Sequence, residues 1–213
     1  MNIYTNFQNG FIYGGNKFNC GTWMDKMGES ELAGNKGIPA TPRDGANIEI
    51  VGMLKSTLRW LINLNQNYPD IFPYSGVDVH NEKDSFHFSY SEWNNLIQEN
   101  FENYFFVHEG ECEFTNEKYV HKRFIYKDTV GGTNEWADYQ LRPNQCVAMV
   151  TAPELFTASN EKLALEKIQE KLLGRLGIKT LDPDDWNYHP YYINQDNNSY
   201  QTAKGFNYHN GPV

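Results

Sequence analysis

An aspartate among apolar side chains is the first residue of this sequence that could act as an acid catalyst. Asp25 stands in the run NCGTWMDKMGES, beside Met24 and close to Trp23 and Met27. Cleavage of a glycosidic bond needs a carboxylic acid that stays protonated near neutral pH. Apolar neighbours raise the pKa of a carboxyl group because they destabilise its charged form. The alternative is a loop aspartate bonded to backbone amides, and the local sequence alone favours that alternative.

A second group of charged residues follows in the run TPRDG, residues 41–45, and includes Glu49 just downstream. Arg43 and Glu49 could hold sugar hydroxyls through charge-assisted hydrogen bonds. Acidic residues are also favoured at the positive end of a helix dipole, so Asp44 and Glu49 could equally serve the start of a helix. Both roles are compatible with this spacing.

Two further polar runs are candidates for ligand contacts. The run DYQLRPNQ, residues 138–145, holds Asp138 and Arg142 before an apolar helix, with more bidentate groups than helix capping needs. A capped helix on a solvated loop is the alternative. The acidic run LDPDD, residues 181–185, lacks the ligand alternation of a calcium loop, and the six histidines show no ligand pairing. The sequence therefore predicts no metal site and no cofactor.

Charge and cysteine content exclude several classes of protein. The net charge is −9, so the basic surface that nucleic-acid binding requires is missing. The three cysteines are odd in number and widely spaced, which predicts neither a disulfide framework nor a zinc site and favours a reducing, cytoplasmic location. The N-terminus lacks the pattern of a signal peptide, and no apolar run is long enough to cross a membrane.

Periodicity predicts a mainly helical scaffold with long loops. Apolar spacing predicts four helices. The first lies near residues 48–64, the second follows a cap at Ser91, and the third follows Pro143. The fourth runs from a cap at Asn160 to about residue 176, where Gly177 would end it. Alternation over 77–90 predicts a small β-hairpin with its turn at 81–84. Residues 178–213 show no helical pattern but are rich in aromatic side chains, so we expect an ordered segment that faces a ligand.

Seven motifs, taken in order, resemble a known family. They are NCGTWMDKMGES, GIPATPRDG, VHKRFIYKD, DYQLRPNQ, AMVTAPELF, LGIKTLDPDD and AKGFNYHNGP. Nearly the whole chain resembles the C-terminal amylo-α-1,6-glucosidase domain of eukaryotic glycogen debranching enzymes. The resemblance implies part of an (α/α)6 toroid and hydrolysis of the α-1,6-linked glucose at a glycogen branch, with glycogen or another branched α-glucan as the partner. The 4-α-glucanotransferase activity of such enzymes belongs to another domain, which nothing here resembles.

The resemblance also implies roles for individual residues. Asp25 matches the proposed general acid. The residues in motifs expected to line the sugar pocket are Trp23, Arg43, Glu49, Asp138, Arg142, Lys204, Tyr208 and His209. The family is thought to invert the anomeric centre, which requires a second carboxylate roughly 6.5–9.5 Å from the acid, across a water molecule.

The sequence departs from the family pattern at its end. The family domain continues beyond the Gly-Pro motif to further helices and a second catalytic carboxylate, and the sequence predicts fewer helices than such a toroid contains. We therefore expect residues 1–213 to be a partial domain, truncated at its C-terminal end and also at its N-terminal end, and inactive without the rest of the debranching enzyme chain. Glu49 or Asp182 would be a rival base. A non-catalytic glycogen-binding module is the alternative function.

Overall fold

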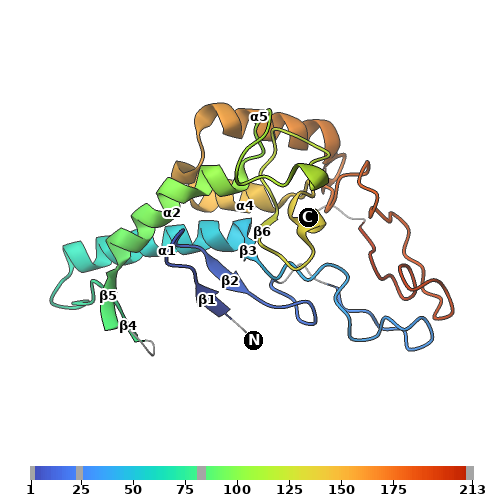
Figure 1. The fold of residues 1–213 in the computed structure, drawn as a ribbon, viewed down its shortest axis with the longest axis horizontal. Helices are drawn as coiled ribbons and strands as arrows, with labels where there is room; N and C mark the ends of the chain where they lie inside the picture. Colours follow the sequence, from blue (N-terminus) through green and yellow to red (C-terminus); the bar gives the residue numbers. More distant parts are fainter. Residues whose placement is uncertain (1–2, 23–25, 81–84, 210–213) are drawn as a thin grey trace.

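Helices form the centre of the structure, and long loops form one end of it (Figure 1). The structure is a computed structural model that describes residues 3–22, 26–80 and 85–209. Its helices are α1 (Ile48–Asn67), α2 (Tyr90–Phe105), α3 (Glu135–Asp138), α4 (Asn144–Thr151) and α5 (Ala158–Lys171), with short 3-10 turns at Glu117–Tyr119 and Pro153–Leu155. These helices are consistent with the predicted helical scaffold. Within the described ranges, no helix has the length and apolar character needed to cross a membrane.

The central helix is α1, which packs against both α2 and α4. Its buried apolar residues are Ile48, Val51 and Leu58, of which the apolar spacing predicts Val51 and Leu58. A β-carbon at Gly52 would lie only 2.7 Å from the Cα of Ala148 in α4, so the two helices approach closely at this glycine. The helix begins where predicted and ends at Asn67, before Tyr68-Pro69, as the restriction on the residue before a proline predicts.

Helix α2 begins with a capping box, but not at the predicted serine. The Ser89 hydroxyl accepts a hydrogen bond from the Glu92 amide, while the Glu92 carboxylate accepts one from the Ser89 amide. The prediction that Ser91 caps this helix is therefore wrong. Ser91 lies inside the first turn, because the capping pattern fits Ser89 and Glu92 three residues later. The buried stripe that includes Ile97 and Phe101 is as predicted.

The predicted hairpin is present as strands β4 (Gly76–His80) and β5 (Ser85–Ser89), which pair antiparallel with Val77 opposite Phe88. The predicted turn at 81–84 lies outside the described residues. The other strands also form two-stranded antiparallel pairs: β1 (Ile3–Thr5) with β2 (Ile12–Gly14), β3 (Ala46–Asn47) with β6 (Thr129–Val130), and β7 (Leu173–Gly174) with β8 (Gly177–Ile178).

The last helix differs from its prediction at both ends. Helix α5 starts at Ala158 after Thr157, and Asn160 lies within it, where its side-chain amide donates to Glu102 at 2.8 Å. The helix stops at Lys171 because the chain turns back there as the β7–β8 hairpin, so Gly177 is a strand residue and not the helix cap. Short-range periodicity cannot show such a hairpin.

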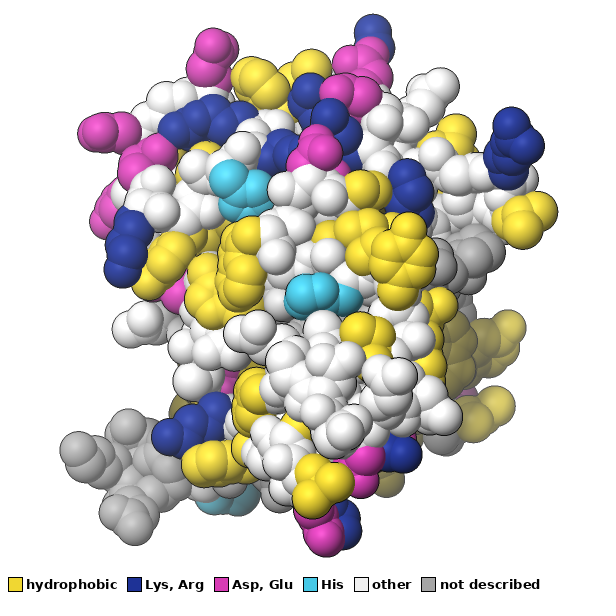
Figure 2. Space-filling model, turned by 90° about the vertical axis from the view of Figure 1, so that its right-hand side faces the viewer, with side chains coloured by type: hydrophobic (Ala, Val, Ile, Leu, Met, Phe, Trp, Pro, Cys, Tyr) yellow, Lys and Arg dark blue, Asp and Glu magenta, His cyan; other side chains and the backbone are white. Residues whose placement is uncertain are grey.

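Two loop segments from opposite ends of the sequence lie side by side at the right of Figure 1. One comprises residues 15–22 and 26–45, and the other residues 179–209. The Ser30 hydroxyl donates to the backbone carbonyl of Asp196 at 2.8 Å, and the Asn35 amide donates to that of Tyr200 at 2.8 Å. Residues 179–209 contain no helix, as predicted. Figure 2 shows this end of the molecule: hydrophobic and uncharged polar groups cover its middle, and charged side chains lie mainly toward its edge.

Candidate active site

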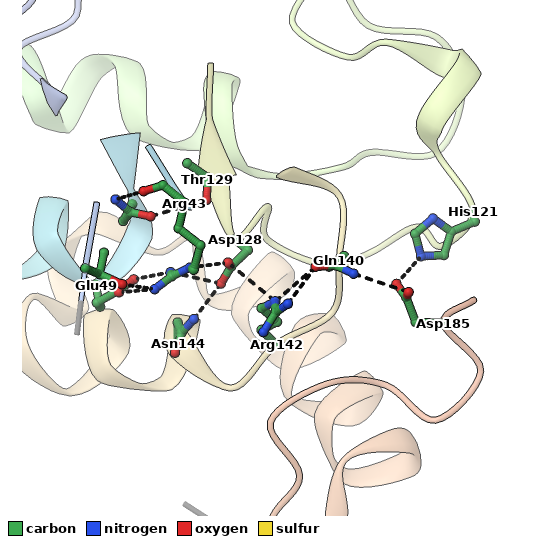
Figure 3. A network of polar contacts seen from close by, with 11 residues as sticks. Arg43, Glu49, His121, Asp128, Thr129, Gln140, Arg142, Asn144 and Asp185 are labelled. Atoms are coloured by element: carbon green, nitrogen blue, oxygen red, sulfur yellow. Dashed lines mark hydrogen bonds and ion pairs between the residues drawn. The ribbon is translucent and has the colours of Figure 1, made fainter. Parts of the chain in front are cut away.

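A buried arginine organises the polar interior beside the loops (Figure 3). Arg43 donates from Nη1 and Nη2 to the two carboxylate oxygens of Glu49, at 2.6 and 2.8 Å. It also donates from Nε and Nη2 to Asp128, at 2.6 and 3.1 Å. The remaining Nη1 hydrogen bonds the hydroxyl of Thr22 at 2.7 Å. All five N–H donors of Arg43 are thus used within the protein.

The backbone around Arg43 explains how its side chain comes to lie beside Asp128. Arg43 has a φ of 47°, a left-handed conformation that is uncommon for a residue with a side chain. The Asn47 side-chain amide donates to the carbonyl oxygens of Arg43 and Gly45, at 2.9 and 3.3 Å, and so stabilises the turn. Asn47 then pairs with Thr129 in the β3–β6 ladder, which brings the preceding residue, Asp128, beside Arg43.

The network extends from Asp128 toward Arg142. Asp128 accepts a hydrogen bond from the Asn144 amide at 2.6 Å and lies 3.8 Å from Nε of Arg142. Two arginines and two carboxylates therefore share one buried region, so their charges compensate one another. Arg142 also donates from Nε and Nη2 to Oε1 of Gln140, at 3.1 and 2.8 Å. Its Nη1 group has no hydrogen-bond partner among the residues that the structure describes.

Three of the predicted site residues meet at a small cavity of about 100 Å³, here called the His209 cavity. Arg142, Tyr208 and His209 all line it. The other lining residues are Lys26, Ala40, Thr41, Thr180 and Asn207. The cavity therefore joins both loop segments to Arg142, which lies two residues before α4.

The wall of the His209 cavity carries polar atoms that the protein leaves unpaired. The Oγ1 of Thr41, the Oδ1 of Asn207 and the Nδ1 of His209 are buried without a hydrogen-bond partner in the described part of the chain. Buried polar atoms are normally paired, so an unpaired cluster indicates a place for a hydrogen-bonding ligand. Burial, together with nearby Arg142 and His189, lowers the pKa of His209 to about 3. His209 is therefore uncharged at neutral pH, and the cavity offers donors and acceptors suited to hydroxyl groups.

Asp138 lies at a different cavity, of about 450 Å³, lined also by Lys127 and Tyr139. Its Oδ2 accepts hydrogen bonds from the amides of Gly131 and Gly132, at 2.9 and 3.3 Å. Burial raises the pKa of the Asp138 carboxyl to about 8, although these two amides and the Lys127 ammonium oppose the rise. Asp138 is thus a carboxyl group that holds its proton at neutral pH, but it does not line the His209 cavity.

The remaining predicted residues lie in several places. Arg43 and Glu49 are in the buried network, with side chains only 1% exposed, and neither is among the residues lining the His209 cavity or the cavity at Asp138. Lys204 is half-buried and is not among the residues lining the His209 cavity. Trp23 and Asp25 lie outside the described residues. Sequence reasoning missed Asp128 and Thr41, although they stand inside the quoted motifs VHKRFIYKD and TPRDG, whereas Asn207 lies within the predicted segment from Lys204 to His209.

The two rival bases are both engaged elsewhere. Glu49 forms an ion pair with Arg43, and Asp182 forms one with Lys122. Neither carboxylate lines the His209 cavity. Within residues 3–22, 26–80 and 85–209, no group of three or more histidine, cysteine, aspartate or glutamate side chains is arranged to hold a metal ion.

Comparison with known proteins gives a consistent result. The family model described as amylo-alpha-1,6-glucosidase matches residues 1–213. The chain is also 45% identical, over 218 aligned residues, to a protein of Saccharomyces cerevisiae (strain ATCC 204508 / S288c) named glycogen debranching enzyme. The match covers all of this chain but only 14% of that relative's length.

Proposed function

The chain belongs to the amylo-alpha-1,6-glucosidase family, and from this membership we propose that it forms part of a glycogen debranching enzyme that hydrolyses α-1,6-linked glucose at branch points. The observation that carries the proposal is the His209 cavity. It gathers Arg142, Tyr208 and His209 around unpaired buried polar atoms, and an uncharged, hydroxyl-rich glucose is a ligand that such a wall suits.

Asp25 is the proposed general acid. It would donate its proton to the glycosidic oxygen as the bond to the leaving glucan breaks. Two described residues close to it in sequence are held by hydrogen bonds. The hydroxyl of Thr22 accepts one from Arg43 at 2.7 Å. Lys26 lines the His209 cavity, and its backbone carbonyl accepts one from the Ala40 amide at 2.9 Å. Trp23 would supply an apolar surface beside the acid and the sugar.

The remaining predicted residues take supporting roles. Arg142, Tyr208 and His209 would bind the terminal glucose through its hydroxyl groups. Arg43 and Glu49 would act on the sugar indirectly, because Arg43 has no free N–H and instead anchors both Thr22 and Asp128. Asp138 and Lys204 would contact parts of the substrate outside the His209 cavity.

The general base is proposed to come from outside this chain. None of the described residues lining the His209 cavity is a carboxylate, and an inverting enzyme needs one to activate water. We place residues 1–213 in a partial domain of an (α/α)6 toroid, completed by the rest of a longer, cytoplasmic protein that also holds 4-α-glucanotransferase activity. The helical scaffold with its loops gathered at one end supports that architecture.

The test is made in the full-length protein. Asp25→Asn should abolish glucose release from phosphorylase-limit dextrin, while transferase activity on linear maltooligosaccharides continues as the internal control. Normal glucose release by the variant would refute the assignment of Asp25.

A non-catalytic glycogen-binding module is the second candidate. The same lack of a carboxylate on the described cavity wall favours it. This alternative predicts that the full-length wild-type protein binds glycogen but releases no glucose from limit dextrin. Glucose release that depends on Asp25 excludes it.

A further inference from the structure

A groove of about 290 Å³ lies next to the His209 cavity. The two share Ala40 and Asn207 in their walls, so the groove and the cavity adjoin at these residues. This groove, here called the Trp groove, is lined by Trp136 at α3 and by residues of both loop segments.

Aromatic rings dominate the Trp groove. Trp136 and Trp186 have ring centroids 4.8 Å apart and are tilted by 56°, while Tyr200 and Phe206 pair edge to face at 5.5 Å. Trp186 is 69% exposed. Neither indole N–H has a hydrogen-bond partner in the described ranges of the chain. An exposed tryptophan beside a second one is an apolar platform with a free polar edge, which is typical of a binding surface.

The polar groups of the groove are almost all uncharged. Side-chain amides come from Asn134, Asn187, Gln201 and Asn207, and Lys17 is the only charged residue among the described lining residues. The Oδ1 of Asn207 is buried without a partner in the same part of the structure. Amides donate and accept at once, as hydroxyl groups do, so this wall suits a neutral polyhydroxylated ligand.

We propose that the Trp groove binds the α-1,4-linked glucan chain that carries the branch. The apolar faces of successive glucose rings would lie on Trp136 and Trp186, and their hydroxyls would bond the amides, with Asn207 at the junction to the His209 cavity. This inference rests on the proposed function, because it assumes that the terminal glucose occupies that cavity. On this inference, the Trp groove recognises the long chain that carries the branch, whereas the His209 cavity holds the terminal glucose.

Other occupants fit the groove less well. A nucleic acid would need cations to neutralise its phosphates, and the described wall holds one lysine. A hydrophobic segment of the longer protein would cover the rings but leave the Oδ1 of Asn207, which has no partner in the described part of the chain, still unpaired, which is costly. A glucan chain satisfies both the rings and the amides.

The experiment measures binding of maltoheptaose by isothermal titration calorimetry to the full-length protein, in a background whose proposed 4-α-glucanotransferase site has been inactivated so that this site does not bind or convert the sugar. Trp186→Ala should weaken binding roughly tenfold, and Trp186→Tyr, which keeps a flat ring, should retain most of the affinity. Trp60→Ala is the matched control, since Trp60 is 60% exposed on α1 and lines no described part of the groove. On limit dextrin, Trp186→Ala should raise KM more than it lowers kcat.

Three results would overturn the proposal. The first is unchanged affinity in a Trp186→Ala protein whose melting temperature matches wild type, and the second is no measurable binding by wild type. The third is a Trp186 shielded from acrylamide quenching before sugar is added, since that would show a protein segment in the groove. The proposed function fails separately: wild-type protein that binds maltoheptaose through Trp186 but releases no glucose from limit dextrin would leave only the groove assignment standing.

Discussion

Arg43 donates hydrogen bonds to both carboxylate oxygens of Asp128, at 2.6 and 3.1 Å, across 85 residues of sequence. Both side chains are only 1% exposed. This pair joins the turn before α1 to the strand β6, and it leads on to Arg142 at the His209 cavity. The geometry of the cavity wall therefore depends on charges that no ligand touches.

Removal of the Arg43 charge should destabilise the protein strongly. Arg43→Gln leaves the carboxylates of Glu49 and Asp128 buried without their main partner, and breaking such a pair costs about 3–5 kcal/mol. Urea denaturation measures the loss in the free energy of unfolding. Arg59→Gln is the control, because Arg59 pairs with Glu154 at the surface and should cost less than about 1 kcal/mol. Equal losses from the two variants would contradict the role of the buried pair.

Asp138 should make the folded state less stable as the pH rises. Its folded pKa is about 8, whereas an unfolded aspartate has a pKa near ~3.9. Between these values the folded protein holds a proton that the unfolded chain releases, so its contribution to stability is full below pH ~4 and is lost as the pH rises to about 8.

The measurement is the free energy of unfolding at pH 5, 6.5 and 8. Asp138→Asn should remove a slope of up to about 1.4 kcal/mol per pH unit. Asp184→Asn, which removes a carboxyl group exposed to solvent, should leave that slope unchanged. A wild-type slope that persists in Asp138→Asn would show that another group is responsible.

His209 should make the folded state less stable as the pH falls, which is opposite to the effect of Asp138. Its pKa is lowered to about 3, while an unfolded histidine takes up its proton near pH ~6.5. Its contribution to stability is therefore present above pH ~6.5 and lost as the pH falls toward 3. His209→Gln, which stays uncharged, should weaken this acid sensitivity in denaturation experiments. An NMR titration offers a direct check: an imidazole resonance absent from the variant should show no titration between pH 5 and 8.

Arg142 should matter for substrate more than for folding. Its Nη1 group has no partner among described residues, and lysine cannot reproduce its planar set of donors. In the full-length protein, Arg142→Lys should lower kcat/KM on limit dextrin by at least about tenfold. Arg59→Lys provides the matched exchange at a surface site and should leave kcat/KM unchanged. Near-normal activity of Arg142→Lys would remove Arg142 from the proposed sugar site.

The helices could be predicted from the sequence, because their apolar spacing reflects burial directly. Helix α1 was located to within a few residues at each end. The ends of α5 were not, since the β7–β8 hairpin depends on contacts outside the helix. Ser91 was chosen over Ser89 as a cap for a similar reason: two serines lie close together, and only the bond to Glu92 distinguishes them.

The site was harder to predict than the scaffold. The motifs identified Arg142, Tyr208 and His209, which do meet at one cavity. They could not show that all N–H groups of Arg43 are used by Glu49, Asp128 and Thr22. A sequence motif does not distinguish a charged side chain that forms an internal ion pair from one that binds a ligand. Asp138 and Arg142 are four residues apart, yet they line different cavities, since α3 ends between them.

The contacts between the two loop segments also fix when the site can form during synthesis. Ser30 bonds the carbonyl of Asp196, and Asn35 bonds that of Tyr200, 166 and 165 residues further along the chain. Helices α1 and α2 can pack soon after they leave the ribosome. The loops that frame the His209 cavity must wait until Tyr200 and His209 have emerged. The end with the loops is therefore expected to be the last part of this chain to assemble, and until then Ser30 and Asn35 lack these partners.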